Sequence, residues 1–312
     1  MPRPSSVVRA VIRFATVAAI AGCSNVSSPN LVAHSITPAA HLQPLAGHWH
    51  GKAPMTSAHN YLAAAVLNGT LYAVGGEQGG NEVKVVESYN PASNAWSVVK
   101  SLRTARESLA AAVVNGILYA VGGYGSGNTQ GTLEAYDPTS NRWTTKASMP
   151  TARANLTADT VNGILYAIGG LGSHGVPLHT VEAYDPSTKK WKSKSPMPTA
   201  RAFLASGVIN DIIYVVGGQV SGMSAATVEA YDPAANTWST KASMQRPRDA
   251  LAVSIANNQL FAIGGETNGD FSTITERYDP TTDAWTANAR MERPRGFSGG
   301  HDREHNLCNW WS

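Results

Sequence analysis

An arginine recurs every 47 or 48 residues over much of this 312-residue chain. The arginines are Arg106, Arg153, Arg201, Arg248 and Arg295, and His59 takes the same place in the first repeat. If the repeats are arranged around one axis, five guanidinium groups would lie near that axis. They could then bind carboxylates, sulfates or acidic peptide segments through charge-assisted hydrogen bonds. These arginines are therefore candidate ligand-binding residues.

A glutamate accompanies the arginine in the repeats and supports a second interpretation. The glutamates are Glu87, Glu134, Glu182, Glu229 and Glu276. A feature that recurs in every repeat belongs more often to the scaffold than to a binding site. We therefore expect a structural Arg–Glu ion pair in each repeat, with ligand binding as the alternative.

Residues that differ between repeats are better candidates for a specific site. The position two residues after each arginine holds Tyr61, Ser108, Asn155, Phe203, Ala250 and Phe297. The loop after each Gly-Gly pair also varies, and it begins with Tyr124 in the second repeat. Variable side chains on a rigid frame commonly form binding sites. Tyr61, Asn155, Phe203 and Tyr124 are therefore predicted to contact a ligand.

Three further anchors recur with the same period and predict the elements that hold these residues. Gly-Gly falls at Gly75-Gly76, Gly122-Gly123, Gly169-Gly170, Gly217-Gly218 and Gly264-Gly265. A tyrosine follows at Tyr89, Tyr136, Tyr184, Tyr231 and Tyr278, and then a tryptophan at Trp96, Trp143, Trp191, Trp238 and Trp285. A period near 47 residues is typical of repeats that each form one small sheet and bury its faces against neighbours.

Each repeat contains the pattern of four strands. Asn115-Gly116 separates two apolar runs, which is the strongest short signal for a hairpin with a type I′ turn. Residues 132–136 and 142–146 form a second pair, joined by a turn that begins at Asp137-Pro138. The Gly-Gly pairs are expected where the backbone needs freedom or close approach. The tyrosine and tryptophan rings are expected to fill the space between neighbouring sheets.

These anchors together resemble the kelch repeat. Met149 to Trp191 shows the pattern, with an arginine after a Met-containing loop, an apolar run, Gly-Gly, Glu-Ala-Tyr-Asp-Pro and tryptophan. The resemblance implies an all-β propeller over residues 45–300, with one four-stranded antiparallel blade per repeat. The five complete repeats are expected at about 53–100, 101–147, 148–195, 196–242 and 243–289.

A sixth blade is incomplete. Trp49 lies 47 residues before Trp96, so residues 48–50 are predicted to be an N-terminal strand that completes the last blade. Residues 290–300 begin a sixth repeat, but the pattern stops there. Residues 301–312 form an irregular tail whose composition is typical of a truncation or a shifted reading frame, with a divergent tail as the alternative.

The N-terminal residues indicate export. Residues 1–22 combine three arginines with a short apolar run, which is typical of a signal peptide. The segment that ends in Cys23 resembles the bacterial lipoprotein cleavage motif, which implies lipidation of Cys23, with an ordinary cleaved signal as the alternative. By the same resemblance, Ser24 favours the outer membrane or a periplasmic face if the organism is Gram-negative. Residues 23–44 are rich in Ser, Pro, Ala and Asn and are expected to be a flexible tether.

Charge and cysteine content exclude several functions. Loss of residues 1–22 would leave 21 basic and 21 acidic residues, so no nucleic-acid-binding field is expected. No cysteine lies between Cys23 and Cys308, which excludes the Tyr–Cys copper chemistry of some kelch oxidases. No motif indicates a metal or a cofactor, and a monomer is expected.

The sequence therefore favours a non-enzymatic binding module at the cell envelope, with an unidentified protein or glycan ligand. The kelch family also includes sialic-acid epimerases or mutarotases, which implies an acid/base pair in the channel mouth. Glu77 or Glu266, beside Arg106 or Arg295, could supply it. A third alternative is a truncated or frameshifted copy without function.

Overall fold

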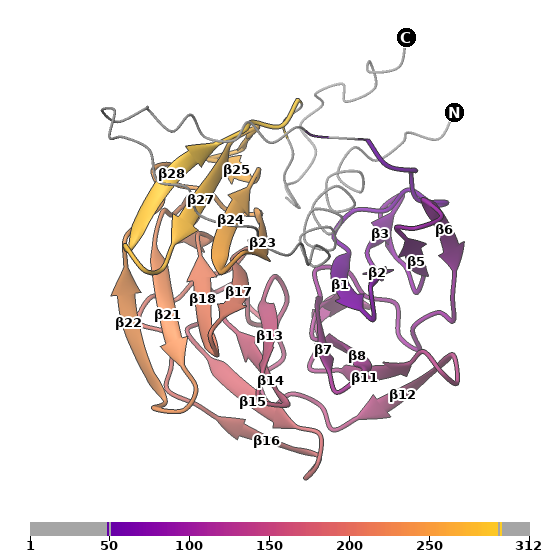
Figure 1. Ribbon diagram of the computed structural model, residues 1–312. Helices are drawn as coiled ribbons and strands as arrows, with labels where there is room; N and C mark the ends of the chain where they lie inside the picture. Colours follow the sequence, from indigo (N-terminus) through magenta and orange to yellow (C-terminus); the bar gives the residue numbers. More distant parts are fainter. Residues whose placement is uncertain (1–48, 50, 293, 295–312) are drawn as a thin grey trace, which may run out of the picture.

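Five four-stranded antiparallel sheets make up the protein, and Figure 1 shows them side by side around a central axis. This arrangement is an all-β propeller with five blades. The structure is a computed structural model that describes residues 49, 51–292 and 294. Within that part of the chain, no helix is long and apolar enough to cross a membrane.

The four strands of each blade follow the predicted order from the axis outward. The innermost strands are β1 (Ala63–Leu67), β7 (Ala110–Val114), β13 (Thr157–Val161), β17 (Ala205–Ile209) and β23 (Ala252–Ala256). The second strands are β2 (Thr70–Val74), β8 (Ile117–Val121), β14 (Ile164–Ile168), β18 (Ile212–Val216) and β24 (Gln259–Ile263). The third strands are β5 (Val86–Asn90), β11 (Leu133–Asp137), β15 (Val181–Asp185), β21 (Val228–Asp232) and β27 (Thr275–Asp279). The outermost strands are β6 (Ala95–Val98), β12 (Arg142–Lys146), β16 (Lys190–Ser193), β22 (Thr237–Lys241) and β28 (Ala284–Asn288).

Short hairpins extend the connection between the second and third strands in four blades. They are β3 (Glu77–Gln78) with β4 (Asn81–Glu82), β9 (Tyr124–Gly125) with β10 (Asn128–Thr129), β19 (Gln219–Val220) with β20 (Met223–Ser224), and β25 (Glu266–Thr267) with β26 (Asp270–Phe271). In the third blade, the corresponding loop contains isolated bridges from Leu171 to Ala154 and to Pro177.

The hairpin turn between the first two strands has the predicted geometry. Asn115 and Gly116 have φ values of 49° and 76°, and Val114 pairs with Ile117 across the turn. Positive φ at both central positions is the requirement of a type I′ turn. The Asn257-Asn258 turn reaches the same region without a glycine, at 51° and 55°, because asparagine tolerates it better than most residues.

The Gly-Gly pair joins each blade to the next through the main chain. Gly123 donates its N–H to the carbonyl of Arg153 in the following blade at 2.9 Å. A Cβ on Gly122 would lie 2.6 Å from that same carbonyl oxygen, and both glycines have positive φ. A side chain on Gly122 would therefore need a shift of the next blade, and one on Gly123 would meet Glu107 and Leu109 of its own blade.

Tyrosine and tryptophan pack between blades, as predicted. Tyr136 and Trp143 are cross-strand partners whose ring centroids lie 5.1 Å apart, and Tyr136 also contacts Tyr72 of the preceding blade. Trp143 donates its indole N–H to the carbonyl of Lys100, again in the preceding blade. The burial is not uniform, since Trp143 is buried whereas Trp191 is partly exposed.

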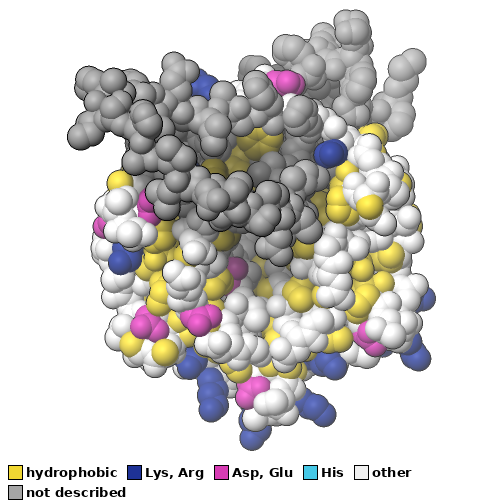
Figure 2. Space-filling view, viewed as in Figure 1, with side chains coloured by type: hydrophobic (Ala, Val, Ile, Leu, Met, Phe, Trp, Pro, Cys, Tyr) yellow, Lys and Arg dark blue, Asp and Glu magenta, His cyan; other side chains and the backbone are white. Residues whose placement is uncertain are grey.

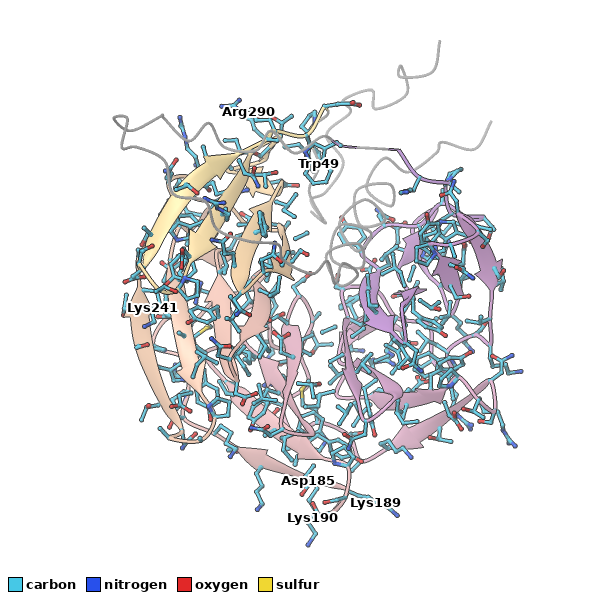
Figure 3. All side chains as sticks on the ribbon, viewed as in Figure 1. Trp49, Asp185, Lys189, Lys190, Lys241 and Arg290 are labelled. Carbon is cyan, nitrogen blue, oxygen red and sulfur yellow. The ribbon has the colours of Figure 1, made fainter. Side chains whose placement is uncertain are left out.

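Trp49 lies against the end of the fifth blade. Figure 3 places it beside Arg290, across the ring from Lys190. Its indole N–H donates to the carbonyl of Ala289 at 3.3 Å, and its ring packs near Ile263 and Met291. The tryptophans of the five blades make the equivalent bond to the end of the preceding repeat. The neighbouring residues His48 and His50, and residues 295–312, lie outside the described part of the chain.

Candidate functional site

The structure contradicts the alternative of a ligand-binding arginine ring. Arg106, Arg153, Arg201 and Arg248 have no exposed surface, and each pairs with the glutamate of its own blade at N–O distances of 2.5 to 3.2 Å. The candidate ligand role of these four arginines is therefore wrong, because no ligand can reach their guanidinium groups. The structural ion pair is confirmed, and Arg295 lies outside the described residues.

Each ion pair holds the loop that enters its blade. Arg106 donates to the carbonyls of Gly122 and Thr132 at 2.6 and 3.0 Å, and to the Glu134 carboxylate at 3.2 Å. Glu134 in turn accepts the backbone N–H groups of Arg103 and Thr104. Buried charges need such pairing, so arginine and glutamate together fix the path of the chain toward the axis.

The first blade keeps this arrangement with a histidine. His59 contacts the carbonyl of Gly75 through Nδ1 at 2.6 Å and lies 3.9 Å from Glu87 through Nε2. Burial alone would raise the pKa of Glu87, but hydrogen bonds from His59, Ser57 and Thr56 lower it to about 2. The Glu87 carboxylate therefore stays ionised. It accepts the backbone N–H groups of Thr56 and Ser57 in the entering loop, as Glu134 does for Arg103 and Thr104.

The variable position two residues after each arginine forms a ring around the axis. Tyr61, Ser108, Asn155, Phe203 and Ala250 all have φ values between 48° and 54°. In the second to fifth blades, the backbone N–H of this residue donates to the carbonyl of the equivalent residue in the preceding blade, at 2.8 to 2.9 Å. We name these five residues the mouth ring. Left-handed backbone is costly for bulky residues such as Phe203, so the ring hydrogen bonds must hold it.

The mouth ring opens into a central cavity of about 590 Å³. All five ring residues line it, together with the innermost strands of the five blades. Figure 2 shows the molecule hollowed at its centre, while the visible Lys and Arg side chains lie mostly at the outer rim. The structure therefore brings three predicted site residues together, namely Tyr61, Asn155 and Phe203.

Tyr124 lies apart from that cavity. It is exposed, and its backbone bridges Glu107 on the connection between blades. Burial raises the pKa of Glu107 to about 7, with a further contribution from the nearby Glu77 and Glu82 carboxylates. Glu77 also accepts the N–H of Gly80. The predicted proximity of Glu77 to an available Arg106 is wrong, because Arg106 is buried in its ion pair.

Glu266 faces a carboxylate partner that the sequence pattern did not reveal. Asp249 and Glu266 are bridge partners on the fifth blade, and both are more than nine-tenths buried. Asp249 accepts a hydrogen bond from Ser224 at 2.7 Å, while Asp249 Oδ1 and Glu266 Oε1 have no partner among the described residues. Burial, together with repulsion from Asp249, raises the pKa of Glu266 to about 7. A comparison of positions 249 and 266 between repeats could have identified the pair.

These raised pKa values predict that stability falls as the pH rises from 5 to 8. A carboxyl group with a raised pKa in the folded state binds more protons folded than unfolded, so ionisation destabilises the fold. Folding raises the pKa of Glu266 from the ordinary 4.5 to about 7, and it raises the pKa of Glu107 by the same amount. Glu266→Gln should remove part of this loss, roughly 2 kcal/mol. Urea unfolding at pH 5 and pH 8 measures it, and equal pH dependence in both proteins would contradict the assignment.

One charged residue of the cavity wall was missed at the sequence level. Asp159 lies on β13, where the equivalent residues of the neighbouring blades are Ala112 and Gly207. It is half-buried, and its Oδ2 atom is enclosed without a hydrogen-bond partner among the described residues. Burial raises its pKa to about 6, although the nearby Ser206 hydroxyl partly opposes the shift.

Comparisons with known proteins agree with this architecture. The family model described as the Attractin/LZTR1 beta-propeller matches residues 71–298. A solved structure titled "Structure of YjhT" is similar with a TM-score of 0.68, at 18% identity, over 78% of this chain and 87% of that one. At this identity the likeness shows the fold alone. A search of curated proteins found no match. The chain is a kelch-type propeller, and it belongs to the Attractin/LZTR1 β-propeller family.

Proposed function

We propose that this protein is a non-enzymatic binding module whose ligand face is the channel mouth. The mouth ring supports the proposal most directly. Five equivalent residues share one costly backbone conformation, yet their side chains are those of tyrosine, serine, asparagine, phenylalanine and alanine. A fixed backbone with variable side chains around a cavity is the arrangement expected of a specific binding site.

The setting of this module is part of the same proposal. Residues 1–22 act as an export signal, Cys23 carries the lipid, and residues 23–44 tether the propeller to the cell envelope. Two or more acyl chains would anchor the protein stably in the membrane. The monomer then presents its mouth to a protein or glycan, with no nucleic acid involved.

We extend the proposal to the closure of the ring. The hydrogen bond from Trp49 to Ala289 corresponds to the bond from Trp143 to Lys100 in the second blade. Trp49 would then supply the outermost strand of an incomplete sixth blade. Such a strand ties the two ends of the ring together, which would protect the edge of the fifth blade.

Replacement of the mouth side chains tests the binding function. Full-length protein is used to capture envelope proteins and to probe a glycan array. Asn155→Ala with Phe203→Ala should reduce capture of the recovered ligand at least tenfold, because both side chains line the cavity. Lys190→Ala is the matched control, since this exposed residue lies on an outermost strand. Absence of any ligand, or equal capture by all variants, would contradict the proposal.

A carbohydrate epimerase or mutarotase is the second candidate, and the Asp249–Glu266 pair favours it. A carboxyl group with a pKa of about 7 suits general acid/base catalysis at neutral pH. Sugar proton exchange that depends on Glu266, and not on Glu77, would support this activity over simple binding. A frameshifted copy without function is the third candidate, and it concerns residues 301–312, which lie outside the described part of the chain.

A further inference from the structure

We propose that the central cavity binds a small organic amine, whose ammonium group contacts Asp159 and whose apolar part fills the space between the innermost strands. The proposal rests on the binding function above and names the class of its ligand. Asp159 is the only charged residue among the described residues that line the cavity of about 590 Å³.

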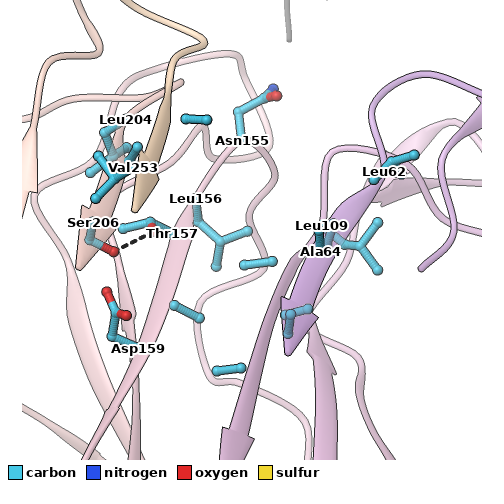
Figure 4. A pocket seen from close by; sticks show the side chains of 18 of the residues that line it. Leu62, Ala64, Leu109, Asn155, Leu156, Thr157, Asp159, Leu204, Ser206 and Val253 are labelled. Carbon is cyan, nitrogen blue, oxygen red and sulfur yellow. Dashed lines mark hydrogen bonds between the residues drawn. The ribbon is translucent and has the colours of Figure 1, made fainter. Parts of the chain in front are cut away.

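The surroundings of Asp159 form a small polar site in an otherwise apolar wall. Figure 4 shows Asp159 near Thr157 and Ser206, whose hydroxyl groups lie 2.5 Å apart, and near Leu156, Leu204 and Val253. The Oδ2 atom of Asp159 has no hydrogen-bond partner among the described residues. A half-buried carboxylate without a cation is costly in an otherwise apolar wall, so a donor that enters the cavity would be stabilised.

The carboxylate is not part of the repeated scaffold. The positions equivalent to Asp159 hold Ala65, Ala112, Gly207 and Ser254. All of these are small, and the blades that carry them form the same sheets. Asp159 is therefore not needed to build a blade, which separates it from the buried glutamates of the ion pairs.

An amine fits this site better than a metal ion does. Among residues 49, 51–292 and 294, no three carboxylate, histidine or cysteine side chains are grouped as metal ligands. A hard divalent cation needs six or more oxygen ligands, and one carboxylate does not provide them. An ammonium group needs only a few acceptors, and Asp159 and Ser206 offer them on the same face of β13. The alanine-rich strands β1 and β7 then accommodate an alkyl or aryl group.

Calorimetry with a matched pair of probes tests the proposal. Benzylamine carries the ammonium group, and benzyl alcohol has nearly the same shape without the charge. We expect full-length protein to bind benzylamine at least tenfold more tightly than benzyl alcohol, and Asp159→Asn to remove that preference. Lys190→Ala, on an outermost strand away from the cavity, should leave it unchanged. In the unaltered protein, the pKa of Asp159, about 6 without ligand, should also fall when benzylamine is present.

The outcomes separate this inference from the binding function itself. Two results would overturn the amine site. One is an equal affinity of the unaltered protein and Asp159→Asn for benzylamine, and the other is that the unaltered protein binds benzyl alcohol as tightly as benzylamine. Calcium binding that competes with benzylamine would overturn it in favour of a metal site. The binding function stands, although the amine assignment fails, if any of these results is obtained while capture of the envelope ligand still depends on Asn155 and Phe203. Circular dichroism of each variant shows that the propeller is folded.

Discussion

Arg106→Ala is expected to lower the free energy of unfolding by about 3 to 5 kcal/mol. The substitution leaves the Glu134 carboxylate buried without its cation, and it removes the donors for the carbonyls of Gly122 and Thr132. Arg106→Lys should also destabilise the fold, because one ammonium group cannot reach all three acceptors. Urea unfolding at pH 7 measures both variants.

The double variant Arg106→Met with Glu134→Leu is the control. Replacement of a buried ion pair by apolar residues of similar size is often neutral or stabilising. The double variant should therefore be more stable than Arg106→Ala, although the backbone N–H groups of Arg103 and Thr104 lose their acceptor. A change of less than 1 kcal/mol in Arg106→Ala would show that the pair does not support the blade.

The repeated anchors made most of the fold predictable from the sequence. The Asn-Gly turns, the Gly-Gly pairs and the aromatic positions each have a local physical reason, so one repeat is enough to place them. Trp143 and Gly123, for example, contact the neighbouring blade in the way that their spacing predicts. Five copies of the same pattern then specify five blades.

The direction of a side chain at the axis could not be predicted in the same way. The spacing places Arg153 near the mouth, but it does not say whether the guanidinium group turns outward or into its own blade. Glu182 decides this, because it is the acceptor that a buried arginine requires. The sequence left both directions open, and the structure shows that the guanidinium group turns into its own blade.

Contacts between segments that share no motif explain the residues that the sequence did not identify. Asp159 is one polar residue within an apolar strand, and its environment comes from β17 of the next blade. The raised pKa of Glu266 likewise depends on Asp249, which lies on the loop that enters the blade. Such pairs share no sequence motif, so they are found only when equivalent positions are compared between blades.

Trp143→Ala is expected to cost about 3 to 5 kcal/mol of stability. The indole is buried against Tyr136, with ring centroids 5.1 Å apart, and it donates to the carbonyl of Lys100 in the preceding blade. Truncation would open a cavity between two blades and leave that carbonyl without its donor. Thermal and urea unfolding of Trp143→Ala and of the unaltered protein measure the loss of stability.

Trp191→Ala is the matched comparison, since it removes the same ring from the next blade. Trp191 makes the equivalent bond to Ala147 at 2.8 Å and packs against Tyr184 in a tilted arrangement, but it is partly exposed. Less apolar surface leaves water when it packs, so its removal should cost about half as much. Equal losses in the two variants would show that the hydrogen bond between blades, and not the buried area, determines the contribution of these tryptophans.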